Sequence, residues 1–249
     1  TTNEDTSISF NPITGTNGAS TDSFEGANPQ ITQINGSNIT AGGASIAVTN
    51  GSVSLAAGNL LTFSPALNFN GAVPAFTYTV ASGNVTEIAN ITVTVNAVND
   101  APVNTVPAAQ STPEDTPHVF SSANTTPNAI TVNDVDGAAT NLTTTITVTN
   151  GVFNAITGGG ATITNNATGT VTINGTAAQI NAALQGASYV NTPDFNGPAL
   201  LTVTTSDGSL IDTDTVALTV TAVVDITNDS PTTNEDTSIS FNPITGTNG

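Results

Sequence analysis

The sequence predicts an all-β protein built from tandem β-sandwiches. Three observations lead to this prediction. Apolar and Thr residues alternate in many short runs, Asn-Gly and Gly-rich turns separate these runs, and only one segment has a helical pattern. Many short strands with turn signals and almost no helix are typical of β-sandwich domains. A chain of 249 residues has room for one to three such domains.

The predicted strands have a period of two, with Val or Ile on the face expected to be buried and Thr on the other face. The clearest are 91–95, 146–149 and 216–222. Further strands are expected at 45–49, 52–56, 60–64, 76–80, 161–164, 170–173 and 200–205. Turns are expected at 50–51, 150–151, 158–160 and 207–208, where Asn-Gly, Gly-Gly or Asp-Gly sequences occur.

One segment, 176–184, favours a short helix. Thr176 is a suitable N-cap, the following residues are good helix formers, and the apolar Ile180 and Leu184 are four residues apart. The helix is expected to bridge two strands in the second half of the chain.

The first eighteen residues of the chain return at its end. The sequence TTNEDTSISFNPITGTNG occupies 1–18 and again 232–249, an offset of 231 residues. A match of this length is not accidental, so we expect one period of a tandem array and the start of the next. Arrays of folded units make a protein long, and this favours an extended surface or fibre protein over an enzyme.

The two halves of the chain also resemble each other. Phe-Asn-Gly occurs at 69–71 and 195–197, and Asn-Asp-x-Pro occurs at 99–102 and 228–231. We therefore predict a first domain at 1–99 and a second domain, with the short helix, at 100–226. Residues 227–249 are expected to be the first strand region of the next repeat.

Composition excludes several functions. The chain has 18 Asp and Glu residues, one His, and no Lys, Arg or Cys, which gives a formal net charge of -18. Without basic residues it cannot neutralise nucleic-acid phosphates or anionic membrane surfaces. Without Cys it has no disulfide or thiolate metal site. No apolar stretch approaches the roughly twenty residues of a membrane span, so no membrane insertion is expected.

The order of these motifs resembles a known family. Glu-Asp-Thr near the start is followed by an Asn-Gly hairpin, Phe-Asn-Gly, Ser-Asp-Gly, a Thr/Val strand and Asn-Asp-x-Pro. This order is similar to the bacterial cadherin-like and VCBS-type immunoglobulin-like repeats of giant secreted, RTX-type adhesins. Segment 173–184 is similar to the short helical insertion of such repeats. The resemblance implies tandem immunoglobulin-like sandwiches that are calcium-stiffened beads of a fibre outside the cell or on the bacterial surface.

Acidic residues are concentrated at the predicted domain ends, and Ca²⁺ prefers such carboxylate and amide oxygens. Expected ligands at the first boundary are Asn99, Asp100, Glu114 and Asp115. Asp134, Asp136 and Asp207 are expected at the same end of the second domain. The second boundary offers Asn228, Asp229, Glu235 and Asp236, and by periodicity Glu4 and Asp5 belong to a junction of that kind. The alternative is that these are solvated loop residues at turns, where Asp and Asn are favoured in any case.

The first domain departs from this pattern. It has Ala81-Ser82-Gly83 where the second has Ser206-Asp207-Gly208, and Asp22 and Glu25 replace the double-Asp loop. We therefore expect it to bind fewer ions, or to bind them more weakly. Weaker ligand candidates in the second domain are Asp194, Asp212 and Asp214.

Enzymatic function is not expected. His118 is the only His and has no Cys partner, and nothing in the sequence arranges a Ser and an Asp around it. Sugar-cleaving sites usually have aromatic platforms, but this chain has no Trp and two Tyr. The Gly158–160 run has no following Lys and so is not a phosphate loop.

The sequence therefore predicts a structural repeat module of a long adhesin or filament, with a role in cell adhesion or a biofilm matrix. Its partners would be neighbouring identical repeats, with additional lateral fibre contacts. One alternative is a surface-layer or sheath subunit that assembles by lateral or strand-exchange contacts. A second alternative is a module that binds carbohydrate or a receptor.

Overall fold

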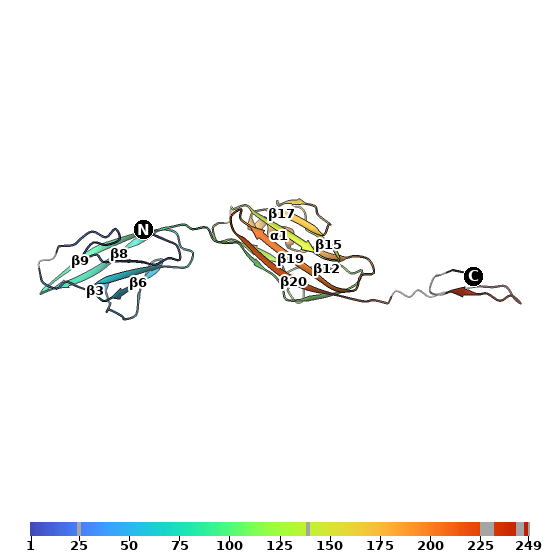
Figure 1. The fold of residues 1–249 in the computed structure, drawn as a ribbon, viewed down its shortest axis with the longest axis horizontal. Coiled ribbons are helices and arrows are strands. Elements are labelled where there is room, and N and C mark those ends of the chain that lie inside the picture. The colour runs from blue at the N-terminus through green and yellow to red at the C-terminus, as the bar shows by residue number, and fades with distance from the viewer. Residues whose placement is uncertain (24–25, 138–139, 225–231, 243–246, 249) are drawn as a thin grey trace. The chain divides into compact units, whose positions relative to one another are not determined.

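The computed structural model describes residues 1–23, 26–137, 140–224, 232–242 and 247–248. The chain divides into two compact units, Thr1–Asp100 and Ala101–Gly249. Each unit contains a β-sandwich, visible in Figure 1, and these are called sandwich 1 and sandwich 2. The all-β prediction is confirmed, and one short helix is present among the described residues.

Sandwich 1 packs a five-stranded sheet against a four-stranded sheet. The first has the order β1 (Thr2–Asn3), β9 (Val85–Asn96), β8 (Gly71–Ser82), β3 (Gln30–Ile34), β4 (Ser37–Asn38). The second has the order β2 (Ile8–Phe10), β7 (Leu60–Pro65), β6 (Gly51–Ala56), β5 (Ile46–Val48). Their inner faces form one apolar core, in which the rings of Phe63 and Phe76 stack 6.1 Å apart.

Sandwich 2 has a larger principal sheet. Its order is β11 (Gln110–Pro113), β20 (Ile211–Thr221), β19 (Gly197–Ser206), β14 (Leu142–Val148), β17 (Thr170–Gly175), β16 (Thr162–Thr164). A three-stranded sheet has the order β12 (His118–Val119), β18 (Ser188–Asn191), β15 (Gly151–Asn154). A third sheet pairs β10 (Val103–Thr105) with β13 (Thr131–Asn133), and β21 (Phe241–Asn242) pairs with β22 (Thr247–Asn248).

The predicted alternation of apolar and Thr residues is visible in the burial of the long strands. In β20, Val216, Leu218 and Val220 are buried, and Ala217 and Thr219 between them are exposed. All the predicted strands overlap strands of the structure. The local pattern was therefore sufficient wherever a strand is long and has one buried face.

The predicted helix is α1 (Ala177–Leu184), and Thr176 is its N-cap. The Gln179 backbone N–H donates to Thr176 Oγ1 at 3.4 Å, and the Thr176 N–H donates to Gln179 Oε1 at 2.9 Å. These reciprocal bonds form a capping box, which satisfies two backbone donors at the helix start. Ile180 and Leu184 are buried in the core of sandwich 2.

An early strand of each sandwich runs parallel to its last long strand. Thr2 of β1 pairs with Val95 of β9, and Gln110 of β11 pairs with Leu218 of β20. Parallel strands have their carboxyl ends at the same edge. The residues that follow β1 and β11 therefore lie at the end of the sandwich where the last long strand leaves.

The Asn-Gly turns at 50–51 and 150–151 begin strands beneath an aromatic ring. Asn50 and Asn150 have the positive φ angles of 60° and 55°, which Asn tolerates better than most residues. A Cβ atom at Gly151 would lie 2.4 Å from the Val190 carbonyl oxygen and 2.6 Å from the Tyr189 ring. The Tyr189 hydroxyl donates to the Asn150 carbonyl oxygen at 2.9 Å. Glycine is required here because the ring packs on the turn.

We expect Gly151→Ala to lower the free energy of unfolding of sandwich 2 by about 1–3 kcal/mol, because the added methyl group overpacks the turn. Gly169→Ala is the matched control, because a Cβ there makes only ordinary contacts of 3.6 Å or longer. Denaturant unfolding followed by circular dichroism gives the comparison. Equal stabilities for the two variants would contradict this account of the turn.

Candidate functional site

The sequence Thr-x-Glu-Asp-Thr occurs three times, at 2–6, 112–116 and 233–237. In each copy the first Thr donates its Oγ1 to the carbonyl oxygen of the last Thr, at 2.6, 3.0 and 3.0 Å. The Asp of each copy has a positive φ, at 55°, 56° and 60°. The local sequence therefore encodes the same tight turn each time, with the Glu immediately before it.

Glu4 is 4% exposed and binds the chain that leaves sandwich 1. Its Oε1 accepts the backbone N–H of Val98 at 2.5 Å, and its Oε2 accepts Nδ2 of Asn70 at 3.4 Å. Its own N–H donates to the Asn96 carbonyl oxygen at 2.9 Å. The carboxylate thus fixes the first residues after β9 to the start of the same sandwich.

Glu114 repeats this arrangement in sandwich 2, where it is 5% exposed. Its Oε1 accepts the N–H of Val223 at 2.6 Å, and its Oε2 accepts Nδ2 of Asn196 at 3.3 Å. Its N–H donates to the Thr221 carbonyl oxygen at 2.8 Å. We call the Glu4 and Glu114 arrangements the exit clamps, because each holds the chain just after its last strand.

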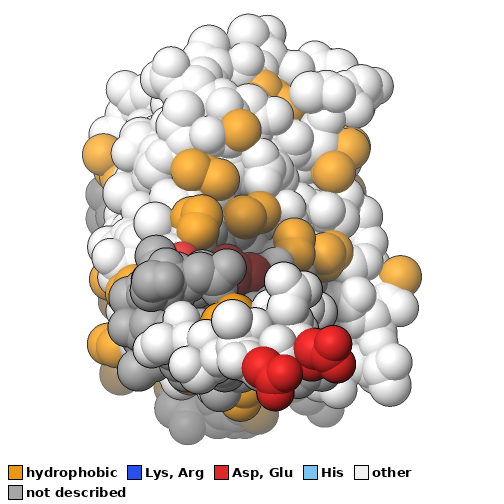
Figure 2. All heavy atoms as spheres, turned by 90° about the vertical axis from the view of Figure 1, so that its right-hand side faces the viewer, with side chains coloured by type: hydrophobic (Ala, Val, Ile, Leu, Met, Phe, Trp, Pro, Cys, Tyr) orange, Lys and Arg blue, Asp and Glu red, His pale blue; other side chains and the backbone are white. Residues whose placement is uncertain are grey.

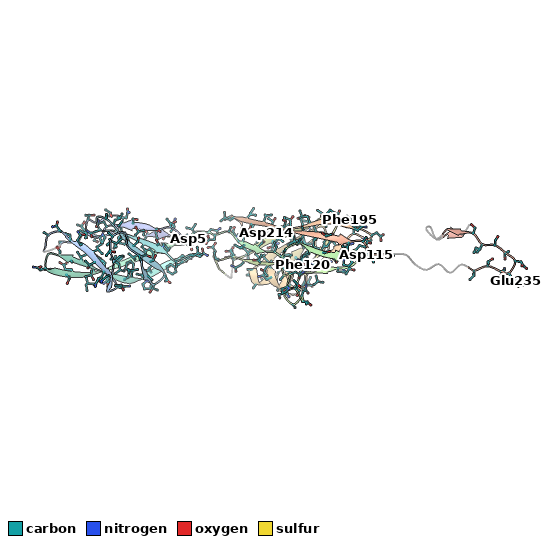
Figure 3. The ribbon with its side chains drawn as sticks, turned by 90° about the horizontal axis from the view of Figure 1, so that it is seen from below. Asp5, Asp115, Phe120, Phe195, Asp214 and Glu235 are labelled. Atoms are coloured by element: carbon teal, nitrogen blue, oxygen red, sulfur yellow. The ribbon has the colours of Figure 1, made fainter. Side chains whose placement is uncertain are left out.

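The Asp that follows each clamp caps a neighbouring loop. Asp5 Oδ1 accepts the Asn68 N–H at 3.0 Å, and Asp115 Oδ1 accepts the Asp194 N–H at 3.3 Å. In Figure 3, Asp115 lies at the same end of sandwich 2 as Phe195, and Asp214 lies towards the other end. These Asp side chains therefore belong to the exit ends as well.

The expected grouping of the acids was wrong. Glu114 and Asp115 had been assigned with Asn99 and Asp100 to the first boundary, but they lie at the exit end of sandwich 2, beside Val223. Glu4 likewise lies beside Val98, so within the first unit it shares an end with Asn99 and Asp100. The reason is the parallel pairing of β1 with β9 and of β11 with β20, which the order of residues in the sequence does not reveal.

The other end of sandwich 2 carries the double-Asp loop. Asp134 directly follows β13 and is 8% exposed. Its Oδ1 accepts the Asp136 N–H at 2.9 Å. Its Oδ2 is buried and has no hydrogen-bond partner among the described residues. Asp134 therefore places a carboxylate oxygen without a hydrogen-bond partner at this end of sandwich 2.

Asp207 and Asp212 lie at the same end of sandwich 2 as Asp134. Asp207 Oδ1 accepts the N–H groups of Ser209 and Leu210 at 2.6 and 2.7 Å, so this carboxylate closes the β19–β20 turn. Asp212 Oδ2 accepts the Asn104 N–H at 2.7 Å, where the chain enters the sandwich. One carboxylate oxygen of each is therefore bound to the backbone.

The remaining predicted ligands are less informative. The side-chain amide of Asn99 donates to the Asp100 carbonyl oxygen at 3.2 Å. Glu235 and Asp236 are exposed. Asn228, Asp229 and Glu25 lie outside the described residues.

In sandwich 1, Asp22 stands where sandwich 2 has the double-Asp loop, and its carboxylate accepts a hydrogen bond from a tyrosine hydroxyl. The Tyr78 hydroxyl donates to Asp22 Oδ2. Burial, and then the hydrogen bond and negative charge of Asp22, raise the pKa of Tyr78 well above its usual range. Asp22 is thus bound to an uncharged donor, whereas Asp134 leaves one oxygen without a partner.

His118 is surrounded by neutral groups. Its Nε2 lies 3.1 Å from Asn128 Nδ2, and its ring meets the Phe120 ring edge-on at 5.0 Å. Burial lowers the pKa of His118 below 6.5. Among the hydrogen bonds of the described residues none joins His118 to a Ser or Asp side chain, and this environment favours a structural role.

Comparison with known proteins gives the following matches. The model of the bacterial Ig domain family matches residues 1–95, the strands of sandwich 1. No curated protein sequence matches the chain. In the part of the chain that the structure describes, no helix is both long and apolar enough to cross a membrane.

Three solved structures are similar to parts of the chain. The human mucin-like protocadherin EC1-2 is 16% identical with a TM-score of 0.35, covering 80% of this chain and 86% of that one. Drosophila N-cadherin EC1-4 is 13% identical with a TM-score of 0.36, covering 80% and 43%. An endo-fucoidan hydrolase of glycoside hydrolase family 107 is 18% identical with a TM-score of 0.26, covering 80% and 24%. The chain therefore spans about a quarter of the hydrolase, and these scores carry no functional argument.

We expect Glu114→Ala to lower the free energy of unfolding of sandwich 2 by about 1–3 kcal/mol, because it removes the charge-assisted hydrogen bonds that the carboxylate accepts from the Val223 N–H and Asn196 Nδ2. Glu4→Ala should do the same in sandwich 1. The exposed Thr215→Ser should change stability by less than about 0.5 kcal/mol and serves as the control. Amide hydrogen exchange reports each sandwich separately, and unchanged protection in both Glu variants would exclude the exit clamps as stabilising contacts.

Stability of sandwich 2 should also fall as pH decreases from neutrality. The pKa of His118 is lower in the folded state than the 6.5 of the free side chain, so the unfolded state binds the proton more readily. The His118 contribution is complete above about pH 6.5 and is lost progressively as pH falls towards the folded pKa. Melting temperatures between pH 7.5 and 5.5 test this, and His118→Gln should have the shallower slope. Equal slopes would show that His118 does not cause the dependence.

Proposed function

We propose that this chain is a structural repeat module of a long adhesin or filament that acts outside the cell, with calcium stiffening the ends of its sandwiches. The observation that carries the proposal is the buried Asp134 carboxylate, which has one oxygen without a hydrogen-bond partner among the described residues. The repeat and the bacterial Ig match support the modular part, and Asp134 supports the calcium part.

The composition of the chain limits the partners that a buried carboxylate can have. A buried carboxylate is costly unless it is paired or fully hydrogen-bonded. This chain has no Lys or Arg, so no basic side chain can pair with it. The exit clamps use backbone and amide donors, and Asp22 uses a tyrosine hydroxyl. Asp134 Oδ2 has no such donor in the described part of the chain, and a bound cation would supply the missing partner.

Calcium fits this loop better than other common cations. The available groups are carboxylate oxygens from Asp134 and Asp136 and the backbone carbonyls of the loop, with no Cys and no second His. Calcium accepts six to eight such oxygens in flexible geometry, whereas magnesium demands a near-ideal octahedron and retains waters. Zinc and copper favour the nitrogen and sulfur ligands that are missing here.

A mechanical role follows from the strand topology. Strands β11 and β20 of sandwich 2 are parallel neighbours with four paired positions, from Gln110–Leu218 to Pro113–Thr221. Tension on the two chain ends would pull these strands in opposite directions along their axes. Their hydrogen bonds would then be loaded together in shear and not broken one by one. The Glu114 clamp adds a further bond at the point where the chain leaves.

The surface suits a fibre that remains soluble. On the face shown in Figure 2, neutral polar atoms predominate and apolar side chains occur in small, separate groups. The net charge of -18 disfavours unspecific association between copies. Neighbouring identical repeats are the partners that we propose for this module.

Calcium should raise the melting temperature of the chain relative to the same protein with a chelator, because a ligand of the folded state stabilises it by mass action, by about 2.7 kcal/mol at a hundredfold excess over Kd. Asp134→Asn should abolish most of this rise. It should also leave the chelated protein equally or more stable, because it removes a buried charge that lacks a partner.

Asp22→Asn is the control for this experiment, because its carboxylate is already bound to Tyr78 and it should retain the calcium response. Calorimetric titration of the same three proteins gives the affinities. If the melting temperature is the same with calcium and with chelator, the calcium part of the proposal is refuted.

A further inference from the structure

Helix α1 carries a side chain that binds the strand immediately before the double-Asp loop. The Val132 N–H donates to Asn181 Oδ1 at 2.7 Å, and Asn181 Nδ2 donates to the Val132 carbonyl oxygen at 2.9 Å. We propose that Asn181 is a positioning residue, which holds the Asp134–Asp136 loop in the shape that binds the cation. This inference rests on the calcium site proposed above and assigns one of its determinants.

The two bonds reproduce the pattern of a neighbouring strand. In an antiparallel ladder, one residue exchanges both its N–H and its C=O with the residue opposite, and the next residue faces the other way. β13 is only three residues long, and its other edge pairs with β10, with Asn104 opposite Val132. The Asn181 amide therefore occupies the place of a strand on the free edge of β13.

Val132 depends on this amide. Val132 is 1% exposed, so water cannot replace a lost partner for its N–H and C=O groups. Unsatisfied backbone groups at a buried site are costly, because they lose their hydrogen bonds to water and gain none in return. Without Asn181 we expect β13 to shift until these groups find new partners.

The position of the Asp134–Asp136 loop depends on the position of Val132 in β13. Asp134 is two residues further along, and its Oδ1 accepts the Asp136 N–H in the turn that follows. A displaced β13 would therefore move Asp134 and open this turn. Cation sites need ligand oxygens at about 2.3–2.6 Å, so a small displacement is enough to weaken binding.

The helix is a firm support for Asn181. Ile180, Ala183 and Leu184 are fully or almost fully buried, and the capping box fixes the first turn. After the helix, Gln185 Nε2 donates to Ser121 Oγ at 2.8 Å. Asn181 thus links the acidic loop to the core of sandwich 2. The helix and the double-Asp loop occur in the same sandwich, and the described part of sandwich 1 has neither.

The chain offers a matched control for a purely structural role. Asn166 makes the same pair of bonds with Ala155, at 2.8 Å from the Ala155 N–H and 3.0 Å to its carbonyl oxygen. No acidic residue is close to either residue in the sequence. Asn166→Leu removes this pair of bonds from the same sandwich, together with a third from the Ala167 N–H to Asn166 Oδ1 at 3.1 Å, and leaves β13 untouched.

The experiment is a calcium titration of the full chain and of its Asn181→Leu and Asn166→Leu variants, by calorimetry and by the amide signals of Asp136 and Gly137. We expect Asn181→Leu to weaken calcium binding by about tenfold or more, the usual effect of losing a residue that orients metal ligands. Asn166→Leu should lower the melting temperature and keep the affinity within about twofold of the original.

Two failures are distinguishable. If the unaltered chain binds no calcium, the proposed calcium site is wrong and this inference is overturned with it. If the chain binds calcium and Asn181→Leu binds it equally well, only the positioning role is overturned.

Two further measurements cover a variant that fails to fold. Asn181→Asp keeps the acceptor for the Val132 N–H and loses the donor to its carbonyl oxygen, so its affinity should fall less than that of Asn181→Leu. Amide exchange in chelator should show faster exchange of the Asp136 N–H in Asn181→Asp than in the unaltered chain. Unchanged exchange at Asp136 would mean that the amide closes a strand edge without shaping the loop.

Discussion

The carboxylates of this protein have no Lys or Arg side chain with which to form salt bridges. The chain has 18 Asp and Glu residues and neither Lys nor Arg. The buried Glu4 and Glu114 therefore accept hydrogen bonds from backbone N–H groups and side-chain amides, and the half-buried Asp22 accepts one from a tyrosine hydroxyl. Asn side chains do the same for the backbone, as at Val132 and Ala155. Hydrogen bonds from neutral donors therefore satisfy the polar groups that ion pairs help to satisfy in other proteins.

This constraint makes the two ends of sandwich 2 different. At the exit end both oxygens of Glu114 have protein donors, so the clamp is complete by itself. At the end where the chain enters, Asp134 is as well buried and lacks a donor for one oxygen. Stiffening by a cation is therefore proposed where the protein has not supplied its own partner, and the exit clamps do not require it.

The fold class, the long strands and the capped helix could be predicted because each depends on neighbours in sequence. The shortest strands, such as β1 and β12, are two residues long and depend on distant partners, so no local pattern marks them. The grouping of the acids failed for a related reason, because the parallel pairing of β1 with β9 joins residues 93 positions apart. Glu4 and Glu114 did share a signal, the recurring Thr-x-Glu-Asp-Thr sequence. Asn181 gave none, since an Asn within a helix has the pattern of a surface residue.

The repeat combines two kinds of sandwich in each period. A period of 231 residues pairs one sandwich whose acid is satisfied by Tyr78 with one whose acid is left for a cation. If calcium binds as proposed, an array would alternate modules that are stable without the ion with modules that depend on it. Removing the ion would then loosen one loop in each period and leave both hydrophobic cores and both exit clamps in place. Loss of stiffness would precede loss of fold, which is the behaviour expected of a filament and not of a protein that folds only on binding metal.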